Sequence, residues 1–142
     1  MQKGYARLSR TWQAGDVVQL TLPMPIQRIE AHPRVQADLG RVAVQRGPVV
    51  YCFEAVDNDG PVKNIVLPQD PKFTAEDRPD LLGGVTVITG VAKDGRIIMA
   101  VPYYAWDHRT AGEMIVWVEQ EGKAAKPDID DPAWKDKLYR PR

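Results

Sequence analysis

The chain has 142 residues, of which 44% are hydrophobic and 27% are charged, and its 19 Lys and Arg residues balance 19 Asp and Glu residues. This length fits one domain with its own core, and the composition excludes a wholly disordered chain and a membrane-spanning one. Because no net charge draws the chain to nucleic acid or to an anionic membrane, we expect neither as a partner.

The single cysteine and the N-terminus bear on the cellular compartment. Cys52 has no second cysteine to pair with, which excludes an internal disulfide and is compatible with a reducing compartment. The first residues, MQKGYARLSRTW, lack the apolar core of a signal peptide. We therefore expect a cytoplasmic protein, the alternative being that the chain is a piece of a longer protein whose signal lies upstream.

The N-terminal stretch predicts a β-hairpin. The segments YARLSRTW (5–12) and VVQLTLP (17–23) flank QAGD, which has the composition of a turn. In the second segment Val18, Leu20 and Leu22 alternate onto one side. We expect that side of the hairpin to be buried.

Four further segments have weaker patterns. PIQRIEAHP (25–33) alternates loosely between proline residues, which is typical of an edge strand. Residues 34–40 predict one helical turn that ends at a glycine. Residues 70–84 are polar and interrupted by proline, so we expect a loop with a short helical turn. Residues 123–142 are charged and proline-rich, which predicts a tail with one short helix near Trp134.

The remaining segments are short, rich in Val, Ile, Tyr and Trp, and bounded by Gly, Pro, Asp or Asn, as strands are. They are 41–46, 49–56, 62–68, 84–92, 96–106 and 113–120. KDG at 93–95 predicts a tight turn between two of them. About nine strands at this spacing predict an all-β fold, an antiparallel, jelly-roll-like β-sandwich over residues 1–122 with little helix.

Few residues are candidates for chemistry. The two histidines, His32 and His108, and one cysteine are too few for a metal site, so we expect no metal. Cys52 lies in the apolar stretch VVYCFEA, where burial raises the pKa of a thiol and makes it a poor nucleophile. Glu54 and Asp57 have the residue types of an acid/base pair, but DNDG is better explained as a polar turn. We expect no catalytic residue.

One cluster has the composition of a ligand site. PYYAWDHRTAGE (102–113) places aromatic side chains, which can stack on sugar rings, beside polar ones that can bind hydroxyl groups. In the alternative interpretation the aromatic rings belong to the core or to an interface, and Asp107 and Arg109 shape the turn. The candidate ligand-binding residues are Tyr103, Tyr104, Trp106, Asp107, His108 and Arg109.

Four other residues are better explained by structure than by function. We expect His32 to form a structural hydrogen bond. We expect Arg46, which ends an apolar strand, to pair with an acid or to bind carbonyl groups at the bend. Trp12 and Trp117 lie in predicted strands and are expected to be packing residues.

Several stretches resemble a known enzyme family. In order, they are GYARLSRTWQAGDVVQLTLPMPIQRIEAHPRV, GRVAVQRGPVVYCFEAVDN, LLGGVTVITG and PYYAWDHRTAGEMIVWV. From about Gly4 to Val118 the chain resembles the C-terminal portion of the β-L-arabinofuranosidase-like glycoside hydrolases of family 127. The stretches QRGPVVYC and PYYAWDHR are fairly specific for this resemblance.

The resemblance implies an accessory role. In that family an α/α barrel carries a zinc-bound cysteine nucleophile, and β-sandwich domains follow it. This chain matches the sandwich part, so the resemblance implies no catalytic residue and no cofactor here, with zinc expected only in the barrel. It also implies that residues 1–36 are the remnant of a preceding sandwich.

The implied function is packing against the catalytic barrel of the same polypeptide and stabilising it, with a second copy of the chain as a further candidate partner. The alternative is a carbohydrate-binding module that uses residues 103–109 to bind an arabinose-containing saccharide. A free-standing enzyme is a third interpretation, for which the sequence offers no coherent active site.

Overall fold

The computed structural model describes residues 5–122 and 128–142. Ten strands join one sheet, and the described residues contain only single 3-10 turns besides. The strands are β1 (Ile26–Ala31), β2 (Arg41–Arg46), β3 (Val49–Glu54), β4 (Val66–Leu67), β5 (Thr74–Arg78), β6 (Val85–Val91), β7 (Ile97–Pro102), β8 (Met114–Ile115), β9 (Val118–Gln120) and β10 (Tyr139–Pro141). The 3-10 turns are η1 (Gln36–Asp38), η2 (Ala55–Asp57), η3 (Val62–Asn64), η4 (Tyr103–Ala105) and η5 (Pro132–Trp134). The predicted all-β class is confirmed.

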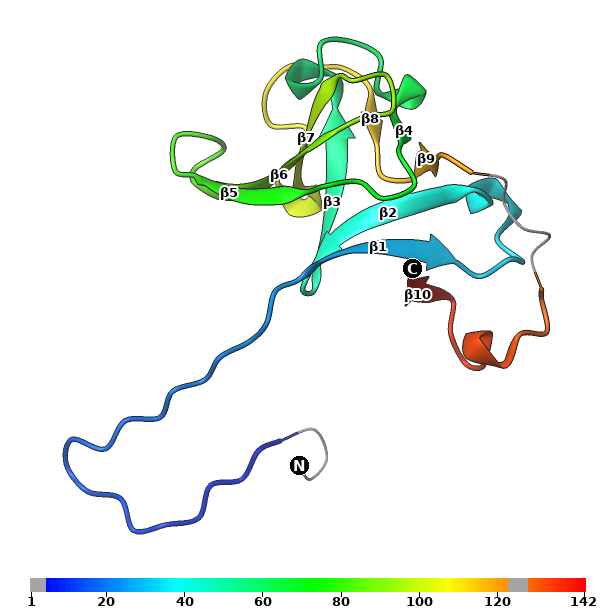
Figure 1. Ribbon diagram of the computed structural model, residues 1–142. Helices are drawn as coiled ribbons and strands as arrows, with labels where there is room; N and C mark the ends of the chain where they lie inside the picture. Colours follow the sequence, from blue (N-terminus) through cyan, green and yellow to red (C-terminus); the bar gives the residue numbers. More distant parts are fainter. Residues whose placement is uncertain (1–4, 123–127) are drawn as a thin grey trace.

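The sheet curls into a half-barrel because the β2–β3 hairpin opens. Its main path runs β10-β1-β2-β3-β7-β6-β5. β2 pairs with β3 only beside the turn, at Gln45–Val50 and Arg46–Val49, and then diverges to pair with β9, while β3 pairs with β7 and β8. The two sides of the fold therefore face each other (Figure 1). All pairs are antiparallel except β4 with β9, which are parallel.

The core lies inside the curl and is made by alternating residues. Val42 and Val44 of β2 meet Tyr51 and Phe53 of β3, together with side chains from β4, β6, β7 and β9. Cys52 points to the other face of β3, into a smaller cluster with side chains of β6, β7 and η4. From Tyr51 to Phe53 β3 is thus buried on both faces, which explains the continuous apolar run there, whereas Val50 beside the turn is 38% exposed.

Several local predictions are confirmed. The KDG turn joins β6 to β7, and its Gly95 has a φ of +86°, a conformation that glycine adopts without steric cost. One 3-10 turn, η1, precedes Gly40 as expected, and η5 contains Trp134. None of the helical turns in the described residues has the length and apolarity needed to cross a bilayer.

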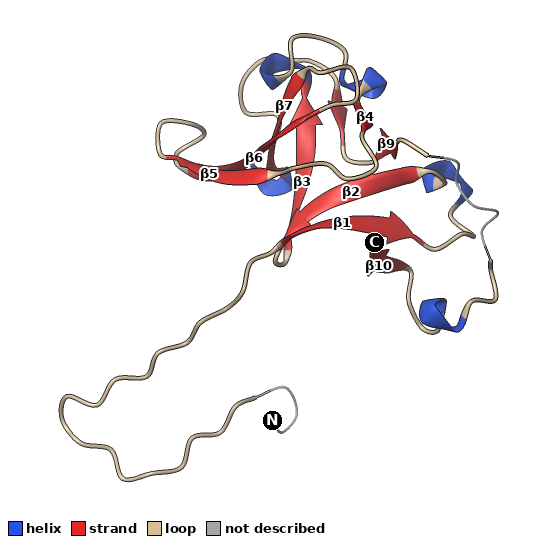
Figure 2. Cartoon of the chain, in the orientation of Figure 1, coloured by secondary structure: helices blue, strands red, loops and turns tan. Residues whose placement is uncertain are grey.

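The predicted N-terminal hairpin is wrong. Residues 6–25 form no strand, and the part of this segment up to residue 22 extends away from the sheet (Figures 1 and 2). The side expected to be buried is open to solvent, with Val18, Leu20 and Leu22 being 59%, 77% and 69% exposed. The described residues supply neither a partner strand nor an apolar surface for this segment, and alternation alone cannot hold an isolated hairpin. We call residues 5–22 the N-terminal arm.

Two other predictions are corrected. β1 is not an edge strand, because β10 pairs with its free side at Ile29–Pro141, Glu30–Arg140 and Ala31–Tyr139. The expected loop at 70–84 contains β5, which pairs with β6 along its whole length. β5 is polar because it is an outer strand that faces solvent on both sides, so it lacks the apolar signal of a strand. The predicted tail partly lies in 123–127, outside the described residues.

Candidate functional site

The aromatic cluster lies where β7 ends. Pro102 closes the strand, and η4 turns the chain so that Ala105 is buried in the smaller cluster with Trp106 packed against it. Tyr103 and Tyr104 stay on the surface, 46% and 69% exposed. The loop therefore presents two tyrosine rings on a fixed base.

Arg109 fastens this loop to the end of β3. Its guanidinium makes a bidentate pair with Asp57, Nη1 to Oδ1 at 2.6 Å, and Nη2 also donates to Oε2 of Glu54 at 2.7 Å. Both carboxylate side chains are only 7% exposed. The hydrogen bonds that Arg109 donates to Asp57 and to Glu54 raise its pKa, although partial burial opposes this shift. A bidentate pair shielded from water is the strongest geometry an arginine forms with an acid.

The backbone completes this anchor. Asp107 has a φ of +63°, in the left-handed region, and its N–H donates to Oε1 of Glu54 at 3.2 Å. Glu54 thus bonds both the backbone and Arg109. The contacts of Asp107 and Arg109 are those of turn-forming residues, and the two carboxylates serve as partners of Arg109 rather than as a free acid/base pair.

The six candidate ligand residues therefore divide into two groups. Tyr103, Tyr104, Asp107 and His108 are exposed on the loop. Trp106 and Arg109 are partly buried beneath it. The rings of Tyr103 and Trp106 lie 6.2 Å apart at an interplanar angle of 38°, so the two do not form a flat platform.

Cys52 has no route to covalent chemistry. Its side chain is fully buried, and its Sγ lies 3.8 Å from the carbonyl oxygen of Val101. Burial, with smaller contributions from Glu54 and Asp57, raises the pKa of its thiol to about 12. At neutral pH the group is a thiol, which is a poor nucleophile. Within residues 5–122 and 128–142 no group of three or more metal-ligating side chains comes together.

Of the predictions for the remaining single residues, some are confirmed and others are not. His32 forms the expected structural bond, because its Nδ1 accepts from the N–H of Arg34 at 3.1 Å. Trp117 packs as expected, stacking on Tyr139 at 5.8 Å. Trp12 is 49% exposed on the N-terminal arm, so its predicted packing role is wrong in the described structure. Arg46 forms no ion pair with a described acid and instead lies beside the Tyr51 hydroxyl, which donates to the carbonyl of Thr86.

Asn58 is a structural residue that the sequence interpretation missed. Its Nδ2 donates to the carbonyl oxygens of Glu54 and Met99 at 2.7 and 2.9 Å, and its Oδ1 accepts from the Met99 N–H at 2.9 Å. It is 1% exposed. An asparagine in a turn next to an apolar strand is the signal that could have indicated such a bond. The sequence gives no signal that the partner is Met99, 41 residues further along the chain.

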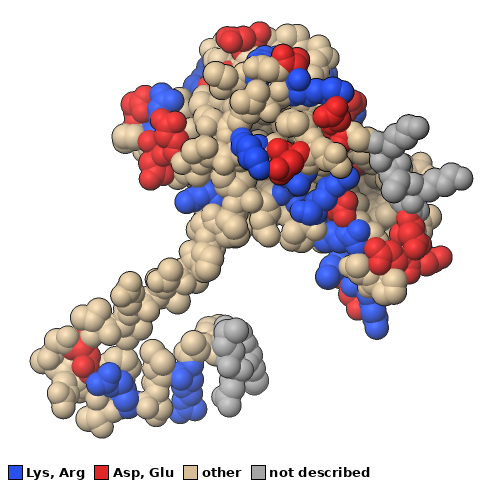
Figure 3. Space-filling view, viewed as in Figure 1, with Lys and Arg blue, Asp and Glu red and all other residues tan. Residues whose placement is uncertain are grey.

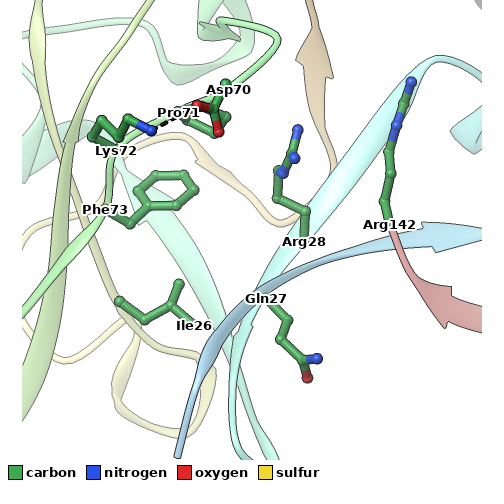
Figure 4. A pocket seen from close by; sticks show the side chains of 8 residues that line it. All are labelled: Ile26, Gln27, Arg28, Asp70, Pro71, Lys72, Phe73 and Arg142. Carbon is green, nitrogen blue, oxygen red and sulfur yellow. Dashed lines mark hydrogen bonds and ion pairs between the residues drawn. The ribbon is translucent and has the colours of Figure 1, made fainter.

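A second missed feature is a hollow beside β1. It is lined by side chains of β1, of the residues before β5 and of the last residue, Arg142 (Figure 4). Elsewhere on the visible face, positive and negative side chains are interspersed (Figure 3). The hollow combines residues from three distant segments, so no local motif marks it.

The chain matches one family model and several known proteins. The model of the glycoside hydrolase family 127 C-terminal domain matches residues 26–119. A non-reducing end β-L-arabinofuranosidase of Bifidobacterium longum subsp. longum is 35% identical over an aligned length of 132 residues. The match covers 73% of this chain and 20% of that protein.

Solved structures agree with this match. A family 127 β-L-arabinofuranosidase from Geobacillus stearothermophilus T6 is 47% identical with a TM-score of 0.63, over 70% of this chain and 19% of that one. A family 127 β-arabinofuranosidase is 41% identical with a TM-score of 0.72, over 80% of this chain and 20% of that one. The chain thus spans about a fifth of the length of these relatives. It belongs to glycoside hydrolase family 127, and its residues 26–119 are the C-terminal domain of that family.

Proposed function

We propose that this chain is a non-catalytic accessory domain that packs against the catalytic barrel of a β-L-arabinofuranosidase-like enzyme and stabilises it. The observation that carries the proposal is the N-terminal arm. Its large apolar side chains are about half to nine-tenths exposed: Tyr5 77%, Leu8 60%, Trp12 49%, Val17 87%, Val18 59%, Leu20 77% and Leu22 69%. Apolar side chains gathered in this way mark a surface that another part of a protein covers.

The chemistry of the domain supports the same proposal. Its concentrated acidic residues, Glu54 and Asp57, are already paired with Arg109, and its thiol is buried. The matched relatives are glycosidases in which the corresponding part is about a fifth of the chain. A domain of this kind contributes contact area to the enzyme rather than reacting groups.

The test uses the Geobacillus stearothermophilus enzyme, which is 47% identical in this region. One variant lacks the corresponding C-terminal part, and a second carries this chain in its place. We expect the deletion to lower the melting temperature by several degrees and the replacement to restore most of that loss. Hydrolysis of a β-L-arabinofuranoside should be absent from the isolated chain. Hydrolysis by the isolated chain, or a deletion that leaves the melting temperature unchanged, would refute the proposal.

A second candidate function is sugar binding at the 103–109 loop. The exposure of Tyr104 on a loop fixed by Arg109 favours it, because a rigid exposed ring can stack on a sugar. Titration with an arabinose-containing oligosaccharide should perturb the tyrosine and tryptophan fluorescence, and Tyr104→Ala should remove the change. An equal response in Tyr104→Ala would eliminate this candidate.

A further inference from the structure

The hollow beside β1 has the size of a small-molecule site. Its volume is about 390 Å³, within the range of about 300–1,000 Å³ found for ligand pockets. Figure 4 shows Arg28 and Arg142 extending to the same side of β1, with Lys72 and Phe73 across from Arg28 and Gln27 pointing away. We call this hollow the Arg28 pocket.

The Arg28 pocket has a local positive charge in a chain whose net charge is zero. Among the side chains that line it, three cations, Arg28, Lys72 and Arg142, outnumber one acid, Asp70, and the α-carboxylate that Arg142 carries in the 142-residue chain leaves the balance positive. Lys72 and Asp70 are bonded at 2.6 Å, but both are largely exposed, and such surface pairs contribute little. Lys72 can therefore exchange its partner for a ligand at small cost.

The side chain of Arg28 and the backbone of Arg142 are held in place, while both guanidinium groups keep free donors. Nη1 of Arg28 donates to the carbonyl of Gln69 at 2.7 Å, and the backbone N–H of Arg142 donates to the carbonyl of Arg28 at 2.9 Å. Within the described part of the chain, the rest of the Arg28 guanidinium and the Arg142 side chain form no other hydrogen bond. A guanidinium group with free donors matches the geometry of a carboxylate, and Arg28 and Arg142 both line this hollow.

The pocket also has an apolar wall. Phe73 packs over Gly90 of β6, where a β-carbon would come within 2.7 Å of its Cδ1, so a larger residue at position 90 would displace the ring. Ile26 lies on the same side (Figure 4). The C–H face of a sugar ring stacks on such an aromatic surface.

From these features we propose that the Arg28 pocket binds a sugar that carries a carboxylate. The carboxylate accepts hydrogen bonds from Arg28 and Arg142, and the sugar ring lies against Phe73. An inorganic anion would use the arginines but not the ring, and a neutral sugar would use the ring but not the arginines. The inference does not depend on the packing role proposed above, because it concerns binding by residues of this chain alone.

The experiment is a titration of the whole chain, followed by amide NMR shifts, with galacturonate, galactose and inorganic phosphate as separate probes. We expect galacturonate to shift the amides of residues 26–28 and 70–73 with millimolar affinity, and the other two probes to bind about tenfold more weakly or not at all. Added salt should weaken galacturonate binding. No shift with galacturonate, or an equal response to galactose or phosphate, would overturn the proposal.

Variants test each contact. Arg142→Gln and Arg28→Gln should each weaken galacturonate binding about tenfold, and Arg7→Gln on the N-terminal arm is the matched control. Arg142 is exposed, so Arg142→Gln leaves the fold intact. It therefore tests the pocket even if Arg28→Gln, which loses the bond to Gln69, disturbs the fold. Asp70→Asn removes the repelling carboxylate and should tighten binding.

The ring is tested in the same way. Phe73→Leu should weaken binding of galacturonate but leave any phosphate response unchanged, and Tyr5→Leu on the N-terminal arm, where Tyr5 is 77% exposed, is its matched control. Loss of binding in Tyr104→Leu but not in Phe73→Leu would place the sugar on the 103–109 loop and overturn the assignment to the Arg28 pocket.

Discussion

At the scale of single residues, Arg109 decides how the aromatic loop is held. It pairs with both Glu54 and Asp57, two carboxylates that are 7% exposed, and its own side chain is 20% exposed. A carboxylate taken out of water is costly unless a counter-charge and hydrogen bonds compensate it. The ion pairs therefore stabilise the fold mainly because their loss would leave two buried charges unmatched.

We expect Arg109→Ala to lower the free energy of unfolding by about 3 kcal/mol, since removal of one member of a buried ion pair leaves its partners uncompensated. Arg109→Lys keeps the charge but not the bidentate geometry, so its free energy of unfolding should lie between those of the unchanged chain and of Arg109→Ala. Urea denaturation measures both. The control is Arg78→Ala, whose partner Asp80 is 65% exposed, and which should change stability little. Equal losses in Arg109→Ala and Arg78→Ala would contradict the expectation.

At the scale of elements, β10 is attached to β1 by a cluster of contacts around Arg140. Its guanidinium donates to Glu30 at 2.7 Å and to Asp131 at 3.0 Å, and it lies 3.9 Å from the centre of the Trp134 ring. Trp134 in turn contacts His32, at 5.2 Å between ring centres. These contacts connect η5 and β10 to β1, which explains how a charged, proline-rich segment becomes ordered.

We expect Arg140→Ala to release β10, because it removes two ion pairs and a cation–π contact together. Limited proteolysis should then cut residues 128–142 several-fold faster, while the β6–β7 hairpin stays protected. Arg140→Lys, which retains the charge, should give an intermediate rate. An unchanged cleavage rate in Arg140→Ala would show that strand pairing alone holds β10.

The same contacts predict an acid dependence. The N–H of Ala133, and then Arg140, lower the pKa of Asp131. A carboxyl group whose pKa is lower in the folded state stabilises the fold above its unfolded pKa, and that contribution is lost as pH falls through the folded value. The attachment of β10 should therefore weaken below about pH 4, which the Trp134 indole signal in an NMR titration reports.

At the scale of the whole molecule, the chain has two parts with opposite properties. The curled sheet encloses its own core, whereas the N-terminal arm exposes its apolar side chains. The folded part begins near Met24, whose sulfur packs against Gly47, and Pro25, whose carbonyl accepts from the Gly47 N–H at 3.2 Å. The N-terminal arm therefore adds no contacts to the core.

We expect removal of residues 1–22 to leave the melting temperature within a few degrees of that of the whole chain, because no core contact is lost. Binding of a dye that reports exposed apolar surface should fall, because the most exposed large side chains lie on the N-terminal arm. Differential scanning calorimetry and dye fluorescence measure the two effects. A strong loss of stability would mean that the N-terminal arm packs on the sheet in solution.

The sequence by itself determined the all-β class, most of the strands and the buried character of β3, because these follow from alternation, apolar runs and turn residues that act over short distances. It also placed Asp107 to Arg109 after a strand, whereas Tyr103 to Trp106, which it put inside the strand 96–106, follow β7 in η4 and the residue after it. Only the tertiary structure decided that Arg109 turns inward, since its partners lie 52 and 55 positions away. It also decided that β5 is a strand, that β10 covers β1, and that the N-terminal arm stays unpaired. Each of these depends on which distant segment supplies a partner, and local patterning carries no information about that choice.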